Sequence, residues 1–266
     1  MKNTNDLSAM MQAWPFDPTS VTARLVETHD QNEEVQLRLD LGILQMKLDG
    51  RPDGGRPHDQ DSAFDYYRRK MITDRRAGPS LDGDACAELQ QECVQFYYRY
   101  LALMVLKDYD RVIRDTRHSL SIFQLVEKFA ESDDLVWEFI QFKPYVHMMN
   151  ARAKAEKLAA EGRIDEAVDQ VERAMGLIRE FLDEMDEDEF PGEDCMELGI
   201  LLELIQDLRE RTEENDTENP VLKLKHKLQY AIHMENFEEA ARLRDKIRAM
   251  ESPAEGSQVP CSAYHS

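Results

Sequence analysis

Residues 153–178, AKAEKLAAEGRIDEAVDQVERAMGLI, carry the clearest helical pattern of the chain. Small and apolar residues recur in it every three or four positions, a spacing that collects them on one face of an α-helix. Gly162 interrupts the pattern near its middle, where a residue without a Cβ atom lets the chain turn sharply. The stretch therefore predicts two helices joined by a tight turn.

The helical pattern extends outward from this stretch, from about Cys86 to Glu214. The residues that interrupt it are typical of helix ends: Asp108, Ser132-Asp133, Gly162 and Pro191-Gly192. These interruptions predict five helices. Pro144 can divide the third helix, because proline does not donate the helical hydrogen bond and crowds the preceding turn.

Residues 153–178 resemble one tetratricopeptide repeat, with small residues where paired helices approach and a glycine in the turn. A fainter echo without the glycine covers residues 103–119. Arrays of such repeats bind peptides on a concave face, but the same pattern also serves packing alone. Both interpretations stay open, and we expect a helical body built from repeat-like hairpins.

The N-terminal part of the chain shows alternation with a period of two, which is typical of β-strands. The alternating apolar positions are Val21, Ala23 and Leu25, and then Val35, Leu37, Leu39, Leu41 and Ile43. They predict a β-hairpin with one buried face, in which Gly42 permits a bulge. A helix through Leu37, Leu41, Leu44 and Leu48 is the alternative. The polar stretch before the hairpin is expected to be a loose arm anchored by Trp14 and Phe16.

Two segments after the hairpin carry concentrated charge. The loop DGRPDGGRPH (residues 49–58) could hold a charged ligand, or it could be a connector, since it lacks the glycine spacing of phosphate-binding loops. Residues 62–76 combine tyrosines with a basic cluster made of Arg68, Arg69, Lys70, Arg75 and Arg76. That cluster is either a solvated helix face or a docking site for the protein's own acidic stretch.

The overall charge limits the classes of partner. With 33 Lys plus Arg and 54 Asp plus Glu the net charge is −21, which disfavours nucleic acid or an anionic membrane as the main partner. No apolar run approaches the about 20 residues that span a bilayer, and the start lacks the features of a signal peptide. We therefore expect a cytoplasmic protein without membrane contact.

No catalytic or metal-binding motif is present in the sequence. Its four cysteines are not spaced as CxxC, and Cys86 and Cys93 lie two helical turns apart, too far for an undistorted disulfide. The seven histidines are scattered, and we expect His118 and His147 to be partly buried helix residues. We therefore expect no enzyme activity, no catalytic residue, no metal and no cofactor.

The acidic residues gather in one segment. Residues 181–219 hold 16 acids against Arg209 and Arg211, so their net charge is 2 − 16 = −14. Carboxylate clusters can bind calcium or magnesium, but the DxDxDG spacing of a calcium loop is missing. This segment is expected to be a solvated connector.

The connector leads into VLKLKHKLQYAIHMENFEEAARLRDKIRAM, residues 221–250. Two apolar stripes at helical spacing predict a hairpin of two helices with Glu235-Asn236 at the turn: Val221, Leu224, Leu228 and Ala231, then Phe237, Ala240, Leu243, Ile247 and Met250. About 30 residues bury too little surface to be stable alone, so the hairpin should pair with a second hairpin or with its own domain. With seven basic and four acidic residues over 220–250, its net charge is 7 − 4 = +3, which favours an acidic partner.

The run NFEEAARLRDKI (residues 236–247) closely resembles the UVR motif, the C-terminal hairpin of the excision-repair proteins UvrB and UvrC. The resemblance implies a protein-interaction device that pairs with another UVR hairpin. Related hairpins occur in Clp-type chaperones and in an adaptor of the arginine kinase system. Together with the first stripe, the resemblance implies this set of partner-binding or hairpin-stabilising residues: Leu224, Leu228, Ala231, Phe237, Ala240, Ala241, Leu243, Arg244, Asp245 and Ile247.

The rest of the chain departs from those relatives, since it lacks a helicase phosphate loop, nuclease motifs and cysteine-rich zinc sites. We expect a mainly α bacterial protein that pairs with itself or with a UVR-containing partner of an excision-repair or Clp and arginine kinase type system. The alternative is a repair-associated regulator that touches nucleic acid through the basic cluster at 68–76. The expected regions are an arm (1–20), a β-hairpin and loop region (21–80), a helical body (81–214), a linker (215–219), the UVR hairpin (220–251) and a disordered tail (252–266).

Overall fold

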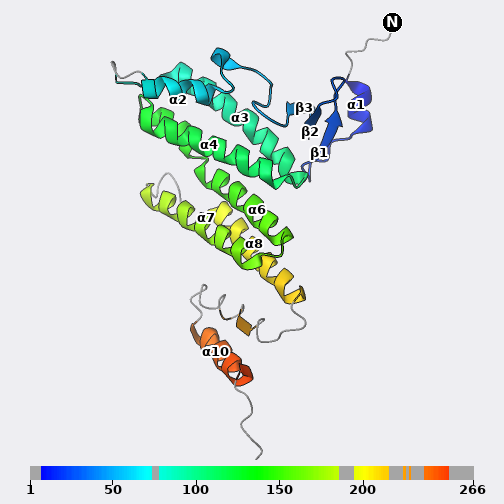
Figure 1. Cartoon of the computed structure of the whole chain (residues 1–266), viewed down its shortest axis with the longest axis vertical. Helices are drawn as coiled ribbons and strands as arrows, with labels where there is room; N and C mark the ends of the chain where they lie inside the picture. Colours follow the sequence, from blue (N-terminus) through cyan, green and yellow to red (C-terminus); the bar gives the residue numbers. More distant parts are fainter. Residues whose placement is uncertain are drawn as a thin grey trace, which may run out of the picture. The chain divides into compact units, whose positions relative to one another are not determined.

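A computed structural model of the protein describes residues 7–73, 78–185, 195–215, 224, 225, 228 and 237–251. These residues are mainly helical, with one small antiparallel sheet near the N-terminus (Figure 1). The predicted fold class, mainly α with a small N-terminal β region, is therefore confirmed. The chain forms two compact units, an N-terminal unit of residues 1–205 and a C-terminal unit of residues 206–266.

The sheet is a meander of three strands, β1 (Ala23–Glu27), β2 (Glu33–Leu39) and β3 (Gly42–Lys47). The predicted hairpin forms, with Leu25 opposite Val35, and a second hairpin follows it, with Leu39 opposite Gly42. Gly42 therefore begins β3 and forms no bulge. Leu41 lies in the two-residue turn and is 91% exposed, so its predicted place in the alternation is wrong. The alternative helix through this region does not form.

The polar face of the central strand is covered by side chains of its neighbours. Glu34, Gln36 and Arg38 are buried although they alternate with Val35 and Leu37. Gln36 receives a hydrogen bond from Arg24 Nε at 2.8 Å and donates one to Gln45 Oε1 at 2.7 Å. Buried polar groups need such partners, because leaving them unpaired is costly.

The predicted loose arm contains a short helix, α1 (Ser8–Ala13), in its described part. The two predicted anchors contact the sheet. The Arg24 guanidinium lies 4.2 Å from the centroid of the Trp14 ring, and Arg38 Nε donates to the Trp14 carbonyl at 2.8 Å. The Arg38 guanidinium also lies 5.8 Å from the Phe16 ring centroid. These contacts join the arm to the N-terminal unit.

A short 3-10 helix, η1 (Pro57–Asp59), follows the sheet. The described residues of the N-terminal unit then form the α-helices α2 (Ala63–Thr73), α3 (Gly83–Val105), α4 (Tyr109–Phe129), α5 (Asp133–Ile140), α6 (Lys143–Ala160) and α7 (Ile164–Glu184). The next helix, α8 (Met196–Asn215), begins in the N-terminal unit and continues into the C-terminal unit. Two of the interruptions seen in the sequence, Asp108 and Ser132, are helix N-caps, whereas Pro191-Gly192 lie outside the described residues. Asp108 accepts from the Arg111 amide at 3.2 Å and Ser132 from the Leu135 amide at 3.4 Å. Pro144 lies in the first turn of α6, where its missing N–H costs nothing, so the predicted division of the third helix is confirmed.

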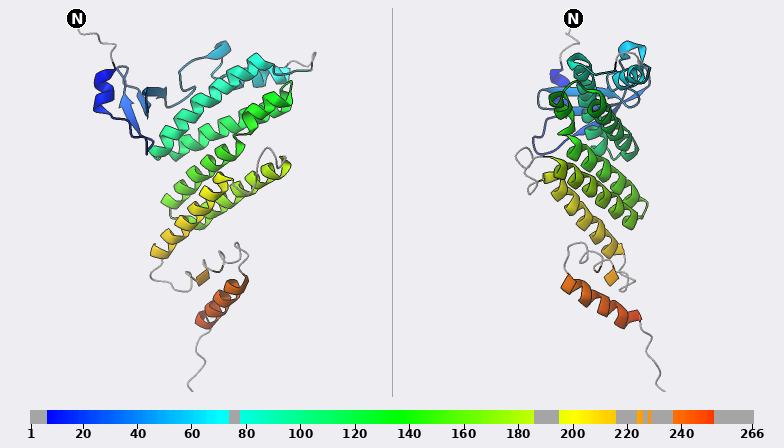
Figure 2. Two further views of the ribbon diagram at one scale, coloured as in Figure 1. Left: turned by 180° about the vertical axis from the view of Figure 1, so that it is seen from behind. Right: turned by 90° about the vertical axis from the view of Figure 1, so that its left-hand side faces the viewer.

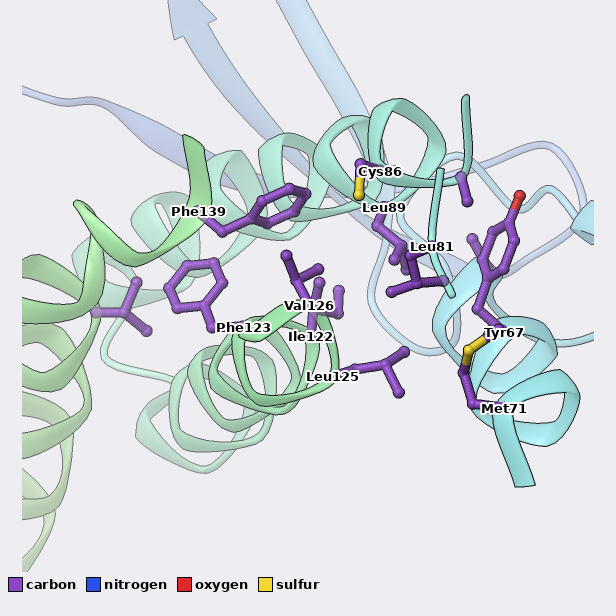
Figure 3. Close-up of a cluster of buried hydrophobic side chains, with 13 residues drawn as sticks. Tyr67, Met71, Leu81, Cys86, Leu89, Ile122, Phe123, Leu125, Val126 and Phe139 are labelled. Atoms are coloured by element: carbon purple, nitrogen blue, oxygen red, sulfur yellow. The ribbon is translucent and has the colours of Figure 1, made fainter. Parts of the chain in front are cut away.

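A hydrophobic core joins α2, α3, α4 and α5 (Figure 3). Ile122 and Val126 of α4 face Leu89 of α3, and all three are fully buried. The rings of Phe123 and Phe139 meet edge to face with centroids 6.2 Å apart. Both views in Figure 2 show α3 lying beside α4 and α6 beside α7, which is the hairpin arrangement predicted from the sequence.

The sheet and the helical body up to residue 205 lie in one compact unit. The side chain of Arg99 in α3 joins them, because its Nη1 donates to the carbonyls of Lys47 at 2.9 Å and Gly50 at 2.7 Å. Arg99 is also paired with Asp115 of α4 at 2.6 and 2.9 Å. The backbone at the end of β3 is thus bonded to the α3–α4 hairpin.

The turn between α6 and α7 depends on the backbone of Gly162, whose φ is +77°. We expect Gly162→Ala to lower the free energy of unfolding by about 1–2 kcal/mol, because a Cβ atom disfavours this left-handed conformation. An added Cβ meets no atom within 4 Å here, so backbone strain is the whole effect.

Gly176 in α7 is the matched control, because its Cβ site is equally open and its φ is helical. Gly176→Ala should raise the free energy of unfolding by about 0.5–1 kcal/mol. Urea unfolding of both variants checks the prediction, which fails if the two changes have the same sign.

Candidate functional site

The predicted interaction hairpin lies in the C-terminal unit, where the structure describes its second helix, α10 (Phe237–Glu251). Of the first helix, the described residues are Leu224, Lys225 and Leu228. Helix α10 begins directly after the predicted turn at Glu235-Asn236 and ends at the predicted tail. The second helix therefore has the predicted boundaries.

One apolar stripe of α10 is buried. Leu243 is 4% exposed and Ile247 is 7% exposed, one turn apart on the same face. Leu224 and Leu228 of the first stripe pack against Leu243. These leucines thus hold the two halves of the hairpin together, with Leu243 buried and Leu224 and Leu228 partly buried. Met250, the last residue of the predicted stripe, is 49% exposed.

The rest of α10 presents exposed charges. Ala241, Arg244 and Asp245 are exposed, and Arg244 Nη2 lies 3.3 Å from Asp245 Oδ1. Because successive residues of a helix turn by about 100°, Arg244 and Arg248 flank the buried stripe on one side and Arg242 and Lys246 on the other. All four basic side chains are exposed. An apolar stripe edged by cations on both sides complements an acidic surface.

The structure thus sorts the predicted partner-binding residues into two groups. Leu243 and Ile247 are buried, while Ala241, Arg244 and Asp245 are accessible. Ala231 and the side chains of Phe237 and Ala240 lie outside the described residues. Arg244 belongs to the predicted set, whereas Arg242, Lys246 and Arg248 were counted only in the predicted positive charge of residues 220–250.

The charges of the loop at 49–58 are bonded within the N-terminal unit. Arg51 contacts Asp53 at 3.0 Å and Glu92 of α3 at 3.3 Å. His58 hydrogen-bonds Glu88 at 2.8 Å and stacks on Tyr66 with ring centroids 3.9 Å apart. These contacts join the loop to α2 and α3 and favour its interpretation as a connector.

The basic cluster at 68–76 is described only for Arg68, Arg69 and Lys70, since residues 74–77 lie outside the described part of the chain. Arg68 pairs with Asp65 at 3.2 Å, and Lys70 Nζ lies 5.8 Å from the Tyr67 ring centroid. Arg69 is exposed. Two of the three described cations are thus already in contact with their own helix.

The described thiols and histidines have the character expected of structural residues. Cys86, Cys93 and Cys195 are free thiols, and burial raises the pKa of the Cys86 thiol to about 11. His118 and His147 are partly buried, as predicted, and burial lowers the pKa of His147. Among the described residues no group of His, Cys, Asp and Glu is arranged to hold a metal ion. None of the described helices is long and apolar enough to cross a membrane.

Comparison with protein families identifies the C-terminal segment. Residues 218–252 match the model of the UvrB/uvrC motif, UVR. The chain carries a UVR motif. The match spans 35 of 266 residues (252 − 218 + 1 = 35), so it identifies this segment and not the whole chain. Neither the comparison with curated proteins nor that with solved structures finds a match.

The UVR motif contains the whole candidate site. Its buried leucine, Leu243, and the exposed Arg244 and Asp245 belong to the run LRD that carries the resemblance. Because the UVR motif is an interaction module of UvrB and UvrC type proteins, the segment is suited to contact another protein. The tetratricopeptide-like resemblance of residues 153–178 stays a prediction, although α6 and α7 form the expected helical hairpin.

Proposed function

We propose that this protein is a non-enzymatic interaction or adaptor protein whose UVR hairpin pairs with a UVR hairpin of a second copy or of a UVR-containing partner. The observation that carries the proposal is the match of residues 218–252 to the UVR model. The partner's system, excision repair or a Clp and arginine kinase type system, is part of the same proposal.

The arrangement of α10 supports this proposal. Its apolar contacts at Leu243 are already made by Leu224 and Leu228, so the hairpin's fold leaves its charged flanks accessible. Met250 adds an exposed apolar side chain at the end of the stripe. A partner surface that covers Met250 and places carboxylates against the flanking cations would be complementary.

Charge distinguishes the two kinds of partner. A hairpin with a net charge of +3 over residues 220–250 repels a second copy of itself. Raising the salt concentration from about 50 to about 300 mM screens that repulsion, so it should strengthen homotypic pairing and weaken pairing with an acidic partner. Sedimentation velocity of the full chain at both salt concentrations measures the first case. Titration of the full chain with the C-terminal hairpin of a UvrB protein, followed by calorimetry, measures the second.

The full chain with Leu243→Asp should lose association in whichever assay shows it, because an unpaired carboxylate at a buried position separates the two halves of the hairpin.

Arg244→Glu should weaken association with an acidic partner at least fivefold without unfolding α10, since this cation is exposed. Arg179→Glu is the matched control, because it makes the same charge change at an exposed position of α7. Association that survives Leu243→Asp unchanged would contradict the proposal, as would the absence of association in both assays.

A further inference from the structure

The N-terminal unit contains a cavity of about 380 Å³ between α3, α4, α5 and α6. Six aromatic side chains line it: Tyr97, Tyr100, Phe123, Phe139, Phe142 and Tyr145. Tyr100, Phe123 and Phe139 form a buried floor, each at most 3% exposed. All the lining residues belong to the N-terminal unit, and the UVR segment belongs to the C-terminal unit.

The mouth of the cavity exposes apolar side chains. Phe142, in the turn between α5 and α6, is 51% exposed, and Val94 of α3 is 47% exposed. Large apolar side chains left at the entrance of an apolar cavity gain contacts only when something occupies it. A volume of this size lies in the range of ligand pockets, and few pockets of this kind form in one domain.

The one charged side chain among the residues that line the cavity is negative. Apart from thiol and phenol groups, Glu138 of α5 is the only acid or base among the lining residues. Its side chain is exposed, and it has no ion-pair partner among the described residues. Burial and the neighbouring Tyr97 raise the pKa of Tyr145 to about 12, and the Arg152 cation of α6 opposes this shift more strongly than Glu197 adds to it. An anionic ligand would meet the Glu138 carboxylate at the edge of the cavity.

The interior of the cavity is mainly apolar, and the rings of Tyr97 and Tyr145 have centroids 6.0 Å apart. The faces of phenyl and phenol rings carry partial negative charge and attract cations. An aromatic lining with one free carboxylate at its edge therefore favours a ligand that has an apolar body and a positively charged group.

We propose that this cavity binds a small organic cation, an ammonium group carried on an apolar ring or chain. The apolar body fills the space over Tyr100, Phe123 and Phe139, and the ammonium group lies against Glu138 and the neighbouring rings. No covalent step is involved. The same chemistry can come from a free amine or from adjacent phenylalanine and lysine side chains of a peptide, and we commit to the free amine because the cavity is bounded by four helices of a single unit.

The test compares three probes that share a phenylethyl body and differ in charge: phenethylamine, 2-phenylethanol and 3-phenylpropionate. Titration calorimetry of the full chain should give phenethylamine an affinity about 5- to 20-fold higher than that of 2-phenylethanol, and 3-phenylpropionate the weakest. The peptide acetyl-Phe-Lys-amide should bind more weakly than phenethylamine. Equal affinity for the cation and the anion, tighter binding of the peptide, or no heat from any probe at millimolar concentration would overturn the proposal.

Two variants place the binding in this cavity. Val94→Trp should fill the mouth and abolish binding, whereas Ile72→Trp, at a 66% exposed position of α2, should leave it unchanged.

Glu138→Gln should reduce the advantage of phenethylamine over 2-phenylethanol to less than about twofold. Asp134→Asn, at an exposed position one turn earlier in α5, removes the same charge and should keep the advantage. Binding that is insensitive to both Val94→Trp and Glu138→Gln would contradict the assignment.

Discussion

Asp115→Asn is expected to lower the free energy of unfolding of the protein by about 3–5 kcal/mol, the largest effect of any single change considered. Asp115 is fully buried, and its carboxylate accepts from Arg99 at 2.6 and 2.9 Å and from Arg114 at 2.9 Å. An asparagine of the same size leaves the Arg99 charge without a counter-ion in the interior. A buried charge that loses its partner costs far more than the pair contributes.

The expected loss should appear as a lower midpoint of urea unfolding with an unchanged slope. Asp110→Asn is the matched control, because Asp110 lies in the same helix and pairs with Lys157 at the surface. That change should cost less than about 1 kcal/mol, since exposed ion pairs contribute little. Arg99→Met should also be costly, because it leaves the carbonyls of Lys47 and Gly50 without their donor. Equal unfolding midpoints for Asp115→Asn and Asp110→Asn would refute this account of the buried pair.

Glu92→Gln is expected to lower the free energy of unfolding by about 2–3 kcal/mol. The Glu92 carboxylate has no exposed surface and receives four hydrogen bonds. The donors are the Ala63 amide at 2.7 Å, the Phe64 amide at 3.2 Å, Arg51 Nη1 at 3.3 Å and His118 Nε2 at 2.9 Å. A glutamine places an NH2 group against at least one backbone donor in either orientation, because each carboxylate oxygen accepts from one of the two amides.

Glu92 also completes the start of α2, because the amides of Ala63 and Phe64 in its first turn have no partner within the helix. Glu92→Gln should therefore speed hydrogen exchange of α2 more than that of α7. Glu88→Gln, one turn earlier in α3, is the control, since Glu88 is 44% exposed and pairs with His58. It should cost less than about 1 kcal/mol and leave α2 protected. Unchanged exchange in α2 of the Glu92→Gln protein would contradict this role.

Glu92 and Arg99 show where sequence reasoning reaches its limit within a helix that it predicted correctly. The apolar stripe of α3 includes Leu89, Phe96 and Leu103, and both charged residues occupy positions three residues further along it. A charge inside an apolar stripe is the signal that could have indicated buried pairs. Their partners, however, are set by contacts with residues as distant in sequence as Lys47 and Ala63, and no local pattern specifies those contacts.

The UVR site was predictable to a different degree. Its residues are contiguous, so the motif at 236–247 and the start of α10 followed from the order of amino acids alone. Which residues of the motif are buried did not follow, because burial of Leu243 depends on Leu224 and Leu228 of the other half of the hairpin. The predicted set therefore mixed residues that stabilise the hairpin with residues that are accessible.

Local signals in the amino-acid sequence specify the helical class, the helix ends at Asp108, Ser132, Pro144 and Gly162, and the UVR segment. Each of these depends on capping, backbone conformation or side-chain spacing within a few residues. Three other features depend on the packing of distant segments: the sheet and the helical body form one unit, Arg99 and Asp115 are buried as a pair, and four helices enclose an aromatic cavity. Burial and pairing arise where such segments meet, so the free energy of these contacts is a property of the packed chain.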